Sequence, residues 1–202
     1  MLGYFTLEQR AHLSEARVGI AGAGGLGSNC AMMLARCGVG TLVLVDGDVV
    51  EPSNLNRQHY FPRHVGQPKV ETLAAQIAEL SPAPCVEAHQ LWLDEGNITP
   101  LLDKADFWLE CLDSAQLKAM FTRLALCTGK PVIGASGMGG FGGYAMTRRV
   151  LHNSGGLLAV VGDFRSDVAQ APPLAPRVMQ CAAMQADAAL EFILTKNIQP
   201  LL

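Results

Sequence analysis

The segment between Arg17 and Asp46 restricts the fold of this chain more than any other part of the sequence. It contains an apolar run at 17–21, a glycine-rich turn, a helical stretch at 28–37 and a second apolar run at 41–45. Gly38 stands just past the helical stretch, where glycine commonly ends a helix. Continuous apolar runs are typical of strands buried on both faces of a parallel sheet. The segment therefore predicts a strand–helix–strand unit with parallel strands.

Strands and helices continue to alternate as far as Ala135. We expect helices over 69–80, 99–102 and 114–127 and strands over 85–91, 107–112 and 131–135. This alternation is typical of an α/β fold with a Rossmann-like, doubly wound and mostly parallel sheet. Beyond Ala135 we expect added C-terminal strands over 144–150 and 157–161, with antiparallel pairing left open, and a closing helix over 177–194.

Composition and charge fit a single domain over residues 1–202. Apolar residues make up 50% of the chain, which is enough to bury a core of ordinary size. Lys and Arg total 15 against 18 Asp and Glu, without a basic tract, so we expect no nucleic-acid partner. No apolar run approaches a membrane span and the N-terminus does not resemble a secretion signal, so we expect no membrane partner and a cytoplasmic location.

The six cysteines lie in segments that otherwise resemble core helices and strands, and none forms a Cys-x-x-Cys pair. We interpret them as small buried side chains kept reduced in a cytosol, without zinc or disulfides. They are Cys30, Cys37, Cys85, Cys111, Cys127 and Cys181.

The turn after the first strand matches a nucleotide-binding fingerprint. Its glycines are Gly22, Gly24, Gly25 and Gly27, and Asp46 follows about 20 residues later at the end of the second strand. Glycines let the backbone approach phosphate, the helix N-terminus favours anions, and an aspartate in this place accepts hydrogen bonds from ribose hydroxyls. We expect a nucleotide here; the alternative is a tight turn that needs glycine for packing alone.

The sequence after Asp46 is not typical of a nicotinamide site. Residues 53–58 read Ser-Asn-Leu-Asn-Arg-Gln, residues 66–69 read Gly-Gln-Pro-Lys, and 111–113 read Cys-Leu-Asp. These motifs resemble the ThiF/MoeB family of the ubiquitin-activating-enzyme superfamily, and a weaker match returns over 179–191. The resemblance implies a homodimeric enzyme that uses ATP and Mg²⁺ to adenylate the C-terminal Gly-Gly carboxylate of a ubiquitin-like sulfur carrier, releasing pyrophosphate. The compact form without zinc cysteines points to a ThiS-like carrier and thiamine biosynthesis.

Two cations and one carboxylate are the candidates for catalysis. Arg57 offers a planar fork for phosphate oxygens, and Lys69 offers a point charge at a helix start, so we assign both to the triphosphate. Asp113 ends a strand and matches the magnesium aspartate of the family; its alternative role is the N-cap of the next helix.

Weaker candidates surround this set. Asn54 and Gln58 match positions that line the nucleotide pocket in relatives, and Asp48 is expected to orient the arginine. Arg10 is the candidate for the arginine that the family delivers to the partner subunit's ATP, with an exposed helix residue as the alternative. His59 and His64 receive no role.

The sequence departs from the family in two ways and leaves three other functions open. Relatives often bind zinc through two Cys-x-x-Cys pairs, which this chain lacks, and no cysteine lies between Cys127 and Cys181 for a thioester step. The alternatives are activation of a MoaD-like carrier in molybdopterin biosynthesis, an NAD-dependent oxidoreductase without a candidate for hydride chemistry, and a non-catalytic nucleotide-binding protein.

Overall fold

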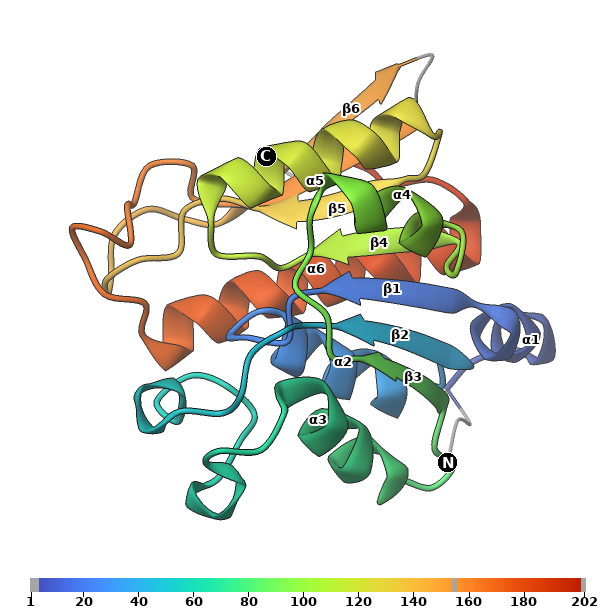
Figure 1. The fold of residues 1–202 in the computed structure, drawn as a ribbon. Coiled ribbons are helices and arrows are strands. Elements are labelled where there is room, and N and C mark those ends of the chain that lie inside the picture. The colour runs from blue at the N-terminus through green and yellow to red at the C-terminus, as the bar shows by residue number, and fades with distance from the viewer. Residues whose placement is uncertain (1–3, 154–155, 201–202) are drawn as a thin grey trace.

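The computed structural model describes residues 4–153 and 156–200, in which seven strands form one sheet of order β3-β2-β1-β4-β5-β7-β6 (Figure 1). All neighbouring strands are parallel except β6 and β7, which pair antiparallel. The expected α/β fold with added C-terminal strands is thus confirmed. The strands are β1 (Arg17–Ala21), β2 (Thr41–Val45), β3 (Cys85–His89), β4 (Phe107–Glu110), β5 (Val132–Ala135), β6 (Thr147–Asn153) and β7 (Gly156–Gly162).

Six α-helices and two short 3₁₀ turns connect these strands in the described part of the chain. They are α1 (Leu7–Glu15), α2 (Gly27–Arg36), η1 (Pro52–Asn54), η2 (Pro62–His64), α3 (Lys69–Ala78), α4 (Glu95–Leu102), α5 (Ala115–Cys127) and α6 (Ala175–Thr195). Helix α4 begins four residues before its expected start. Asp94 caps it by accepting hydrogen bonds from the backbone N–H groups of Gly96 and Asn97, which places its first turn ahead of Pro100.

The sheet separates two hydrophobic clusters, as continuous apolarity in its strands predicts. Residues of α2, α3 and α6 pack on one face, and residues of α4 and α5 pack on the other (Figure 1). Successive residues of β1 show the alternation, because Ile20 belongs to the first cluster and Ala21 to the second. Gly19 leaves room for the ring of Trp108 on the neighbouring strand, where a Cβ would lie 2.3 Å from the indole.

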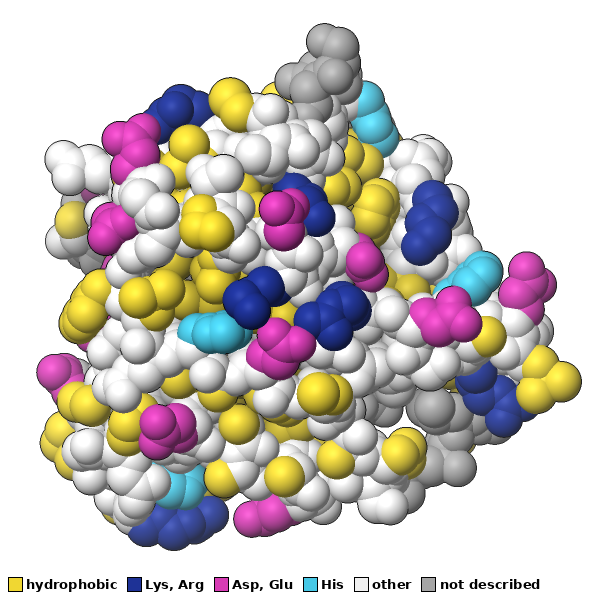
Figure 2. Space-filling view, turned by 45° about the vertical axis from the view of Figure 1, so that its right-hand side comes forward, with side chains coloured by type: hydrophobic (Ala, Val, Ile, Leu, Met, Phe, Trp, Pro, Cys, Tyr) yellow, Lys and Arg dark blue, Asp and Glu magenta, His cyan; other side chains and the backbone are white. Residues whose placement is uncertain are grey.

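The surface matches the charge balance of the sequence. On the face shown in Figure 2, basic and acidic side chains are interspersed. Glu87 on edge strand β3, for example, lies 2.6 Å from Arg17 and 3.9 Å from Lys104. None of the helices in the described residues is both long and apolar enough to span a bilayer. Residues 1–3, which open the N-terminal stretch considered for a secretion signal, lie outside the described part.

The order of the strands fixes where a ligand can bind. The chain winds from β1 through β2 to β3, then returns to the other side of β1 with β4. The connections leaving β1 and β4 therefore diverge to opposite faces and leave a crevice at the carboxyl ends of these strands. Figure 1 shows these ends at the left of the sheet, where the long loops gather.

Candidate functional site

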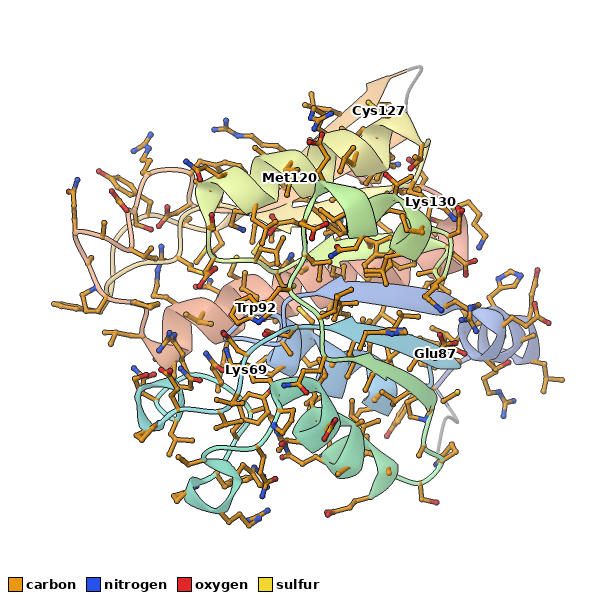
Figure 3. The ribbon with its side chains drawn as sticks, in the orientation of Figure 1. Lys69, Glu87, Trp92, Met120, Cys127 and Lys130 are labelled. Atoms are coloured by element: carbon orange, nitrogen blue, oxygen red, sulfur yellow. The ribbon has the colours of Figure 1, made fainter. Side chains whose placement is uncertain are left out.

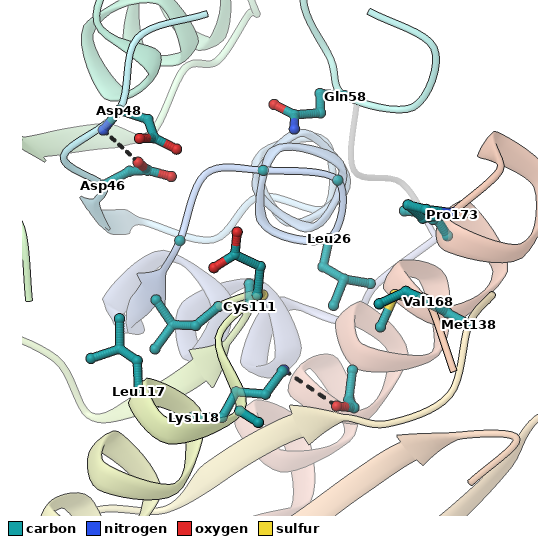
Figure 4. A pocket seen from close by; sticks show the side chains of 18 of the residues that line it. Leu26, Asp46, Asp48, Gln58, Cys111, Leu117, Lys118, Met138, Val168 and Pro173 are labelled. Atoms are coloured by element: carbon teal, nitrogen blue, oxygen red, sulfur yellow. Dashed lines mark hydrogen bonds between the residues drawn. The ribbon is translucent and has the colours of Figure 1, made fainter. Parts of the chain in front are cut away.

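A cavity of about 470 Å³ occupies the crevice at the carboxyl ends of the strands (Figure 4). This volume is within the range of small-molecule sites. Most of the site residues expected from the sequence line it, namely Gly22, Gly24, Gly25, Asp46, Asp48, Arg57, Gln58, Lys69 and Asp113. Gly27 and Asn54 are not among the lining residues.

The glycines after β1 serve two different purposes. Gly22 has a φ of +94°, and a Cβ there would lie 2.6 Å from the carbonyl oxygen of Cys111, so the turn requires glycine. A Cβ at Gly27 would lie 1.8 Å from the carbonyl oxygen of Gly22, so α2 starts this close only without a side chain. A Cβ at Gly24 would have Nε2 of Gln58 as its nearest neighbour, at the ordinary contact distance of 3.6 Å. Packing therefore explains Gly22 and Gly27, whereas Gly24 leaves backbone open to a ligand.

Asp46 ties the end of β2 to the glycine turn. Its Oδ2 accepts a hydrogen bond from the backbone N–H of Ala23 at 2.7 Å, and its Oδ1 accepts one from that of Asp48 at 2.8 Å (Figure 4). A carboxylate has about four lone-pair sites, so these two bonds leave acceptor capacity. Asp46 is fixed by the backbone and still offers its oxygens to the cavity.

Asp48 pairs with Lys69, which corrects the expectation that it orients Arg57. The Nζ of Lys69 lies 2.6 Å from Oδ2 of Asp48, and the backbone N–H of Lys69 donates to the carbonyl oxygen of Asp48. An isolated antiparallel β-bridge between Val49 and Pro68 brings the segment after β2 next to the start of α3. Arg57 instead donates through Nη1 to the carbonyl oxygen of Ser53 and to Oδ1 of Asn56.

Two residues that sequence analysis missed fasten the Arg57 segment to the glycine turn. Nδ2 of Asn29 donates to the carbonyl oxygens of Gly25 at 2.6 Å and Arg57 at 3.0 Å, and Oγ of Ser28 accepts from the backbone N–H of His59. Their position directly after the glycine turn, in the first turn of α2, was the available signal. The glycine turn and the Arg57 segment therefore form one fixed wall.

The amides of Asn54 and Gln58 differ in their surroundings. Oδ1 of Asn54 accepts from the backbone N–H of Glu51, so this buried residue holds the η1 turn together behind the cavity wall. The expectation that Asn54 lines the pocket is thus wrong for this structure. Oε1 of Gln58 is buried without a hydrogen-bond partner while the residue lines the cavity. Gln58 therefore retains a polar atom that a ligand can satisfy.

Asp113 is exposed at the cavity wall and does not cap the next helix. Ser114 is the N-cap of α5, and its Oγ accepts from the backbone N–H of Leu117 at 3.4 Å. The capping alternative considered for Asp113 is thereby excluded. Among residues 4–153 and 156–200, no group of three or more His, Cys, Asp or Glu side chains is arranged to hold a metal. A cation at Asp113 would need its remaining ligands from a bound molecule or water.

A second ion pair at the cavity was not anticipated from the sequence. Nζ of Lys118 lies 3.0 Å from each carboxylate oxygen of Glu110, and the backbone N–H of Leu112 donates to Oε1 of Glu110 at 2.8 Å. Lys118 lines the cavity, whereas Glu110 is almost fully buried. Burial raises the pKa of Glu110, with Lys118 and the Leu112 N–H acting in the opposite direction.

The six cysteines differ in their burial. Cys30, Cys111 and Cys181 are buried, as expected, and burial raises the pKa of the Cys111 thiol well above its ordinary value and that of Cys181 to about 12. Cys111 lines the cavity but is held as a neutral thiol. The expectation of burial is wrong for Cys85 and Cys127, which are exposed because one begins an edge strand and the other ends α5. Cys37 is half-buried.

The far wall of the cavity comes from loops that the sequence showed merely as glycine-rich or polar. Asp163, after β7, forms a buried ion pair with Arg177 of α6, and its Oδ1 accepts from the backbone N–H groups of Arg165 and Ser166. Oγ of Ser166 accepts from the N–H of Gly139, which joins this loop to the one after β5. The joined loops contribute Met138, Val168 and Pro173 to the lining (Figure 4).

Arg10 lies at the opposite end of the sheet from the cavity. It borders a shallow surface pocket with residues such as Gly40 and Pro82, which precede β2 and β3. Its Nε is within 3.5 Å of the carbonyl oxygen of Thr6 in the same helix turn. Arg10 therefore cannot reach the cavity of its own chain.

Comparisons with known proteins identify the family of the chain and the fold that it shares. The sequence profile of the ThiF family matches residues 1–201. The chain is 40% identical over 135 residues to the adenylyltransferase and sulfurtransferase uba4 of Emericella nidulans, a match that covers 66% of this chain and 28% of that protein. The chain thus spans well under half the length of this relative.

Solved structures share the fold. The E. coli tRNA N6-threonylcarbamoyladenosine dehydratase TcdA in complex with ATP superimposes with a TM-score of 0.85 at 21% identity, covering 96% of this chain and 91% of that chain. E. coli MccB with AMPCPP and MccA superimposes with a TM-score of 0.75 at 21% identity, covering 95% and 60%. At this level of identity the likeness establishes the architecture.

Proposed function

Because the chain belongs to the ThiF family, we propose that it uses ATP to adenylate the C-terminal carboxylate of a small carrier protein, releasing pyrophosphate. One observation carries the proposal: a single cavity is lined by the glycine turn, by Asp46 at the end of β2, by the cations of the two motifs, Arg57 and Lys69, and by the exposed Asp113. The nicotinamide alternative has no candidate residue for hydride chemistry in this sequence. The relative named an adenylyltransferase is consistent with the proposal.

The roles of the residues follow from the charges in the reaction. The carrier carboxylate, ionised at pH 7, attacks the α-phosphorus of ATP, and the bond to pyrophosphate breaks. Gly24 gives the phosphates access to backbone, and Asp46 accepts hydrogen bonds from the ribose hydroxyls. Arg57 and Lys69 offset the negative charge that grows on the phosphate oxygens as pyrophosphate leaves.

Asp113 is the residue that would hold magnesium. Mg²⁺ commonly binds through one or two carboxylates together with substrate phosphates, which fits one exposed carboxylate beside the proposed triphosphate site. When bound, the ion supplies Lewis-acid neutralisation of the phosphate oxygens. The proposal includes no zinc, because the chain has no Cys-x-x-Cys pair, and no thioester step, because no cysteine lies between Cys127 and Cys181.

The acceptor in this proposal is a ubiquitin-like sulfur carrier that ends in Gly-Gly. A tail without side chains suits entry into the cavity between the glycine turn and the far wall. Two pathways share this step: activation of a ThiS-like carrier in thiamine biosynthesis and of a MoaD-like carrier in molybdopterin biosynthesis. Carriers of both kinds are therefore included in the assay below. The six unpaired cysteines are consistent with a reducing, cytoplasmic setting.

A homodimer is part of the same proposal. Arg10 lies away from the cavity of its own chain, so it could act only at the cavity of a second copy. Mixing an Arg10→Ala variant with an Asp113→Ala variant would form mixed dimers in which one cavity has both side chains. Recovery of activity on mixing would support action in trans; activity equal to that of the separate variants would remove Arg10 from the site.

ATP–pyrophosphate exchange tests the proposed function directly. The purified protein is assayed with magnesium and a panel of ThiS-like and MoaD-like carriers, each with an intact or a truncated Gly-Gly tail. We expect exchange that requires one intact tail. Absence of exchange across the panel, together with tight binding of NAD, would overturn the proposal in favour of an oxidoreductase.

Neighbouring residues provide a matched pair of variants. Asp113→Ala should abolish exchange at unchanged unfolding free energy, because Asp113 is exposed and does not cap α5. Ser114→Ala should retain exchange and lower the unfolding free energy by about 1 kcal/mol, because it removes that cap. Full exchange in the Asp113 variant would remove it from the magnesium role.

A further inference from the structure

Trp92 is the one aromatic side chain among the described residues that line the cavity. It lies between β3 and α4, near the same end of the sheet as Lys69 (Figure 3). Its carbonyl oxygen accepts from Nδ2 of Asn97 at 2.9 Å, and the N–H of Leu91 donates to the carbonyl oxygen of Asp46. The backbone is therefore anchored on both sides, while the residue is 70% exposed.

The indole of Trp92 packs across the backbone of Gly47. A Cβ at Gly47 would lie 2.5 Å from Cδ2 of the ring and 2.7 Å from Cγ, so this contact exists only because residue 47 has no side chain. Gly47 directly follows Asp46, whose carboxylate faces the cavity. One face of the ring is thus covered by backbone, and its large exposure shows that the other is open.

We propose that Trp92 is the base-stacking residue of the nucleotide site. The inference rests on the proposed function, in which Asp46 binds the ribose hydroxyls and the phosphates lie toward Gly24 and Arg57. The base leaves the sugar from the carbon next to the one that bears the 2′-hydroxyl. A ribose held at Asp46 with its phosphates on the glycine side therefore directs the base toward the open face of Trp92.

The surroundings of Trp92 suit a planar, weakly polar group. Leu91, Leu93 and Leu112 also line the cavity. The cations Arg57 and Lys69 are the residues proposed to bind the phosphates. Aromatic side chains stack on any base because every base has a π face. Trp92 accordingly contributes affinity for the nucleoside part of the ligand and none for its phosphates.

Intrinsic fluorescence gives a direct readout, because the chain has two tryptophans in contrasting places. Trp108 is fully buried against Phe121 and does not line the cavity. We expect Mg-ATP to quench the fluorescence of the wild-type protein and inorganic tripolyphosphate to leave it unchanged. In Trp92→Phe, which retains Trp108 alone, ATP should cause no quenching although it still binds.

Binding measured by calorimetry separates stacking from other roles. Trp92→Ala should weaken ATP binding about tenfold and leave tripolyphosphate binding unchanged, and Trp92→Phe should retain most of the affinity. Gly47→Ala should weaken ATP binding less, because its Cβ displaces the indole, and should have no further effect in a Trp92→Ala background. Phe141→Ala, at an exposed aromatic outside the cavity lining, is the matched control and should bind ATP normally.

The outcomes distinguish this inference from the function on which it rests. Calorimetric ATP binding without quenching, or with equal affinity in Trp92→Ala, would overturn the stacking role and leave adenylation standing. A Trp92→Ala variant that changes the KM for the carrier alone would assign the indole to carrier contact and likewise overturn it. No ATP binding to the wild-type protein would overturn both.

Discussion

Two lysine–carboxylate pairs meet the cavity, one from the β2–α3 side and one from α5, and they are built in opposite ways. In the first pair the side chain of Lys69 is 7% exposed and that of Asp48 is 43% exposed. In the second the side chain of Lys118 is 25% exposed and that of Glu110 is 4% exposed. The buried member is thus the cation in one pair and the carboxylate in the other.

The difference determines what each pair can do when a polyanion binds. Lys69 can exchange its partner for a phosphate, because water solvates the carboxylate of Asp48 that it leaves. Lys118 cannot do so at low cost, because Glu110 would remain charged and buried without a partner. A lysine that lines the cavity is therefore not necessarily a phosphate ligand. We propose that Lys69 binds the phosphates of the nucleotide and that Lys118 keeps the buried carboxylate of Glu110 paired.

The largest expected effect comes from Lys69→Met. This change removes a cation proposed to act on the reacting phosphates, so ATP–pyrophosphate exchange should fall about 1,000-fold. The unfolding free energy should change by less than about 1 kcal/mol, because Asp48 stays solvated. Exchange kinetics and urea denaturation of the same preparation check both parts. Retention of full exchange would break the distinction between the two lysines.

Lys118→Met should act on stability instead. It leaves Glu110 buried without its partner, and breaking a buried pair in this way costs about 3 kcal/mol of unfolding free energy. Adding Glu110→Gln should restore most of the loss, because the amide carries no charge and its oxygen can still accept from the N–H of Leu112. Urea denaturation measures both variants. Unchanged stability with lost exchange would show that Lys118 acts on the substrate.

The contrast also explains which parts of the site were predictable. The glycine turn, Asp46, Arg57 and Lys69 are encoded locally, by short motifs beside strands whose apolar runs mark them as buried. These motifs predicted most of the residues that line the cavity and the mostly parallel sheet. Their exact partners were not encoded in the same way, because the Lys69–Asp48 contact depends on a bridge between two separate loops.

Features that arise from packing between distant segments were missed or misjudged. Lys118 and Trp92 belong to no recognisable sequence motif. Their roles depend on residues from other segments that they contact, Glu110 and Gly47 respectively. The apolar stretch around Cys127 predicts a core residue, but Cys127 is the last residue of α5 and is exposed. Composition gives the proportion of buried side chains and does not assign the exposed face of a helix.

Asp48→Asn sharpens the comparison with a smaller effect. If Lys69 exchanges partners, Asp48 competes with the phosphates for it, so neutralising Asp48 should tighten ATP binding by about three- to tenfold. The protein without nucleotide should lose about 1 kcal/mol of unfolding free energy, because buried Lys69 loses its counter-charge. Calorimetry with ATP and urea denaturation without it measure the two parts. Weaker ATP binding would indicate that Asp48 positions Lys69 and does not compete for it.

The smallest effect concerns the pH dependence of the second pair. Burial raises the pKa of Glu110 above its ordinary value of 4.5, against the influence of Lys118. A carboxyl whose pKa is higher in the folded state binds more protons there, so its contribution to stability is fully present below pH 4.5 and is lost as the pH rises through the folded pKa. The wild-type protein should therefore gain unfolding free energy relative to Glu110→Gln as the pH falls from 7 toward 4.5. Urea denaturation of both proteins at several pH values measures this difference. A difference that shrinks on acidification would mean that Lys118 outweighs burial in setting the pKa of Glu110.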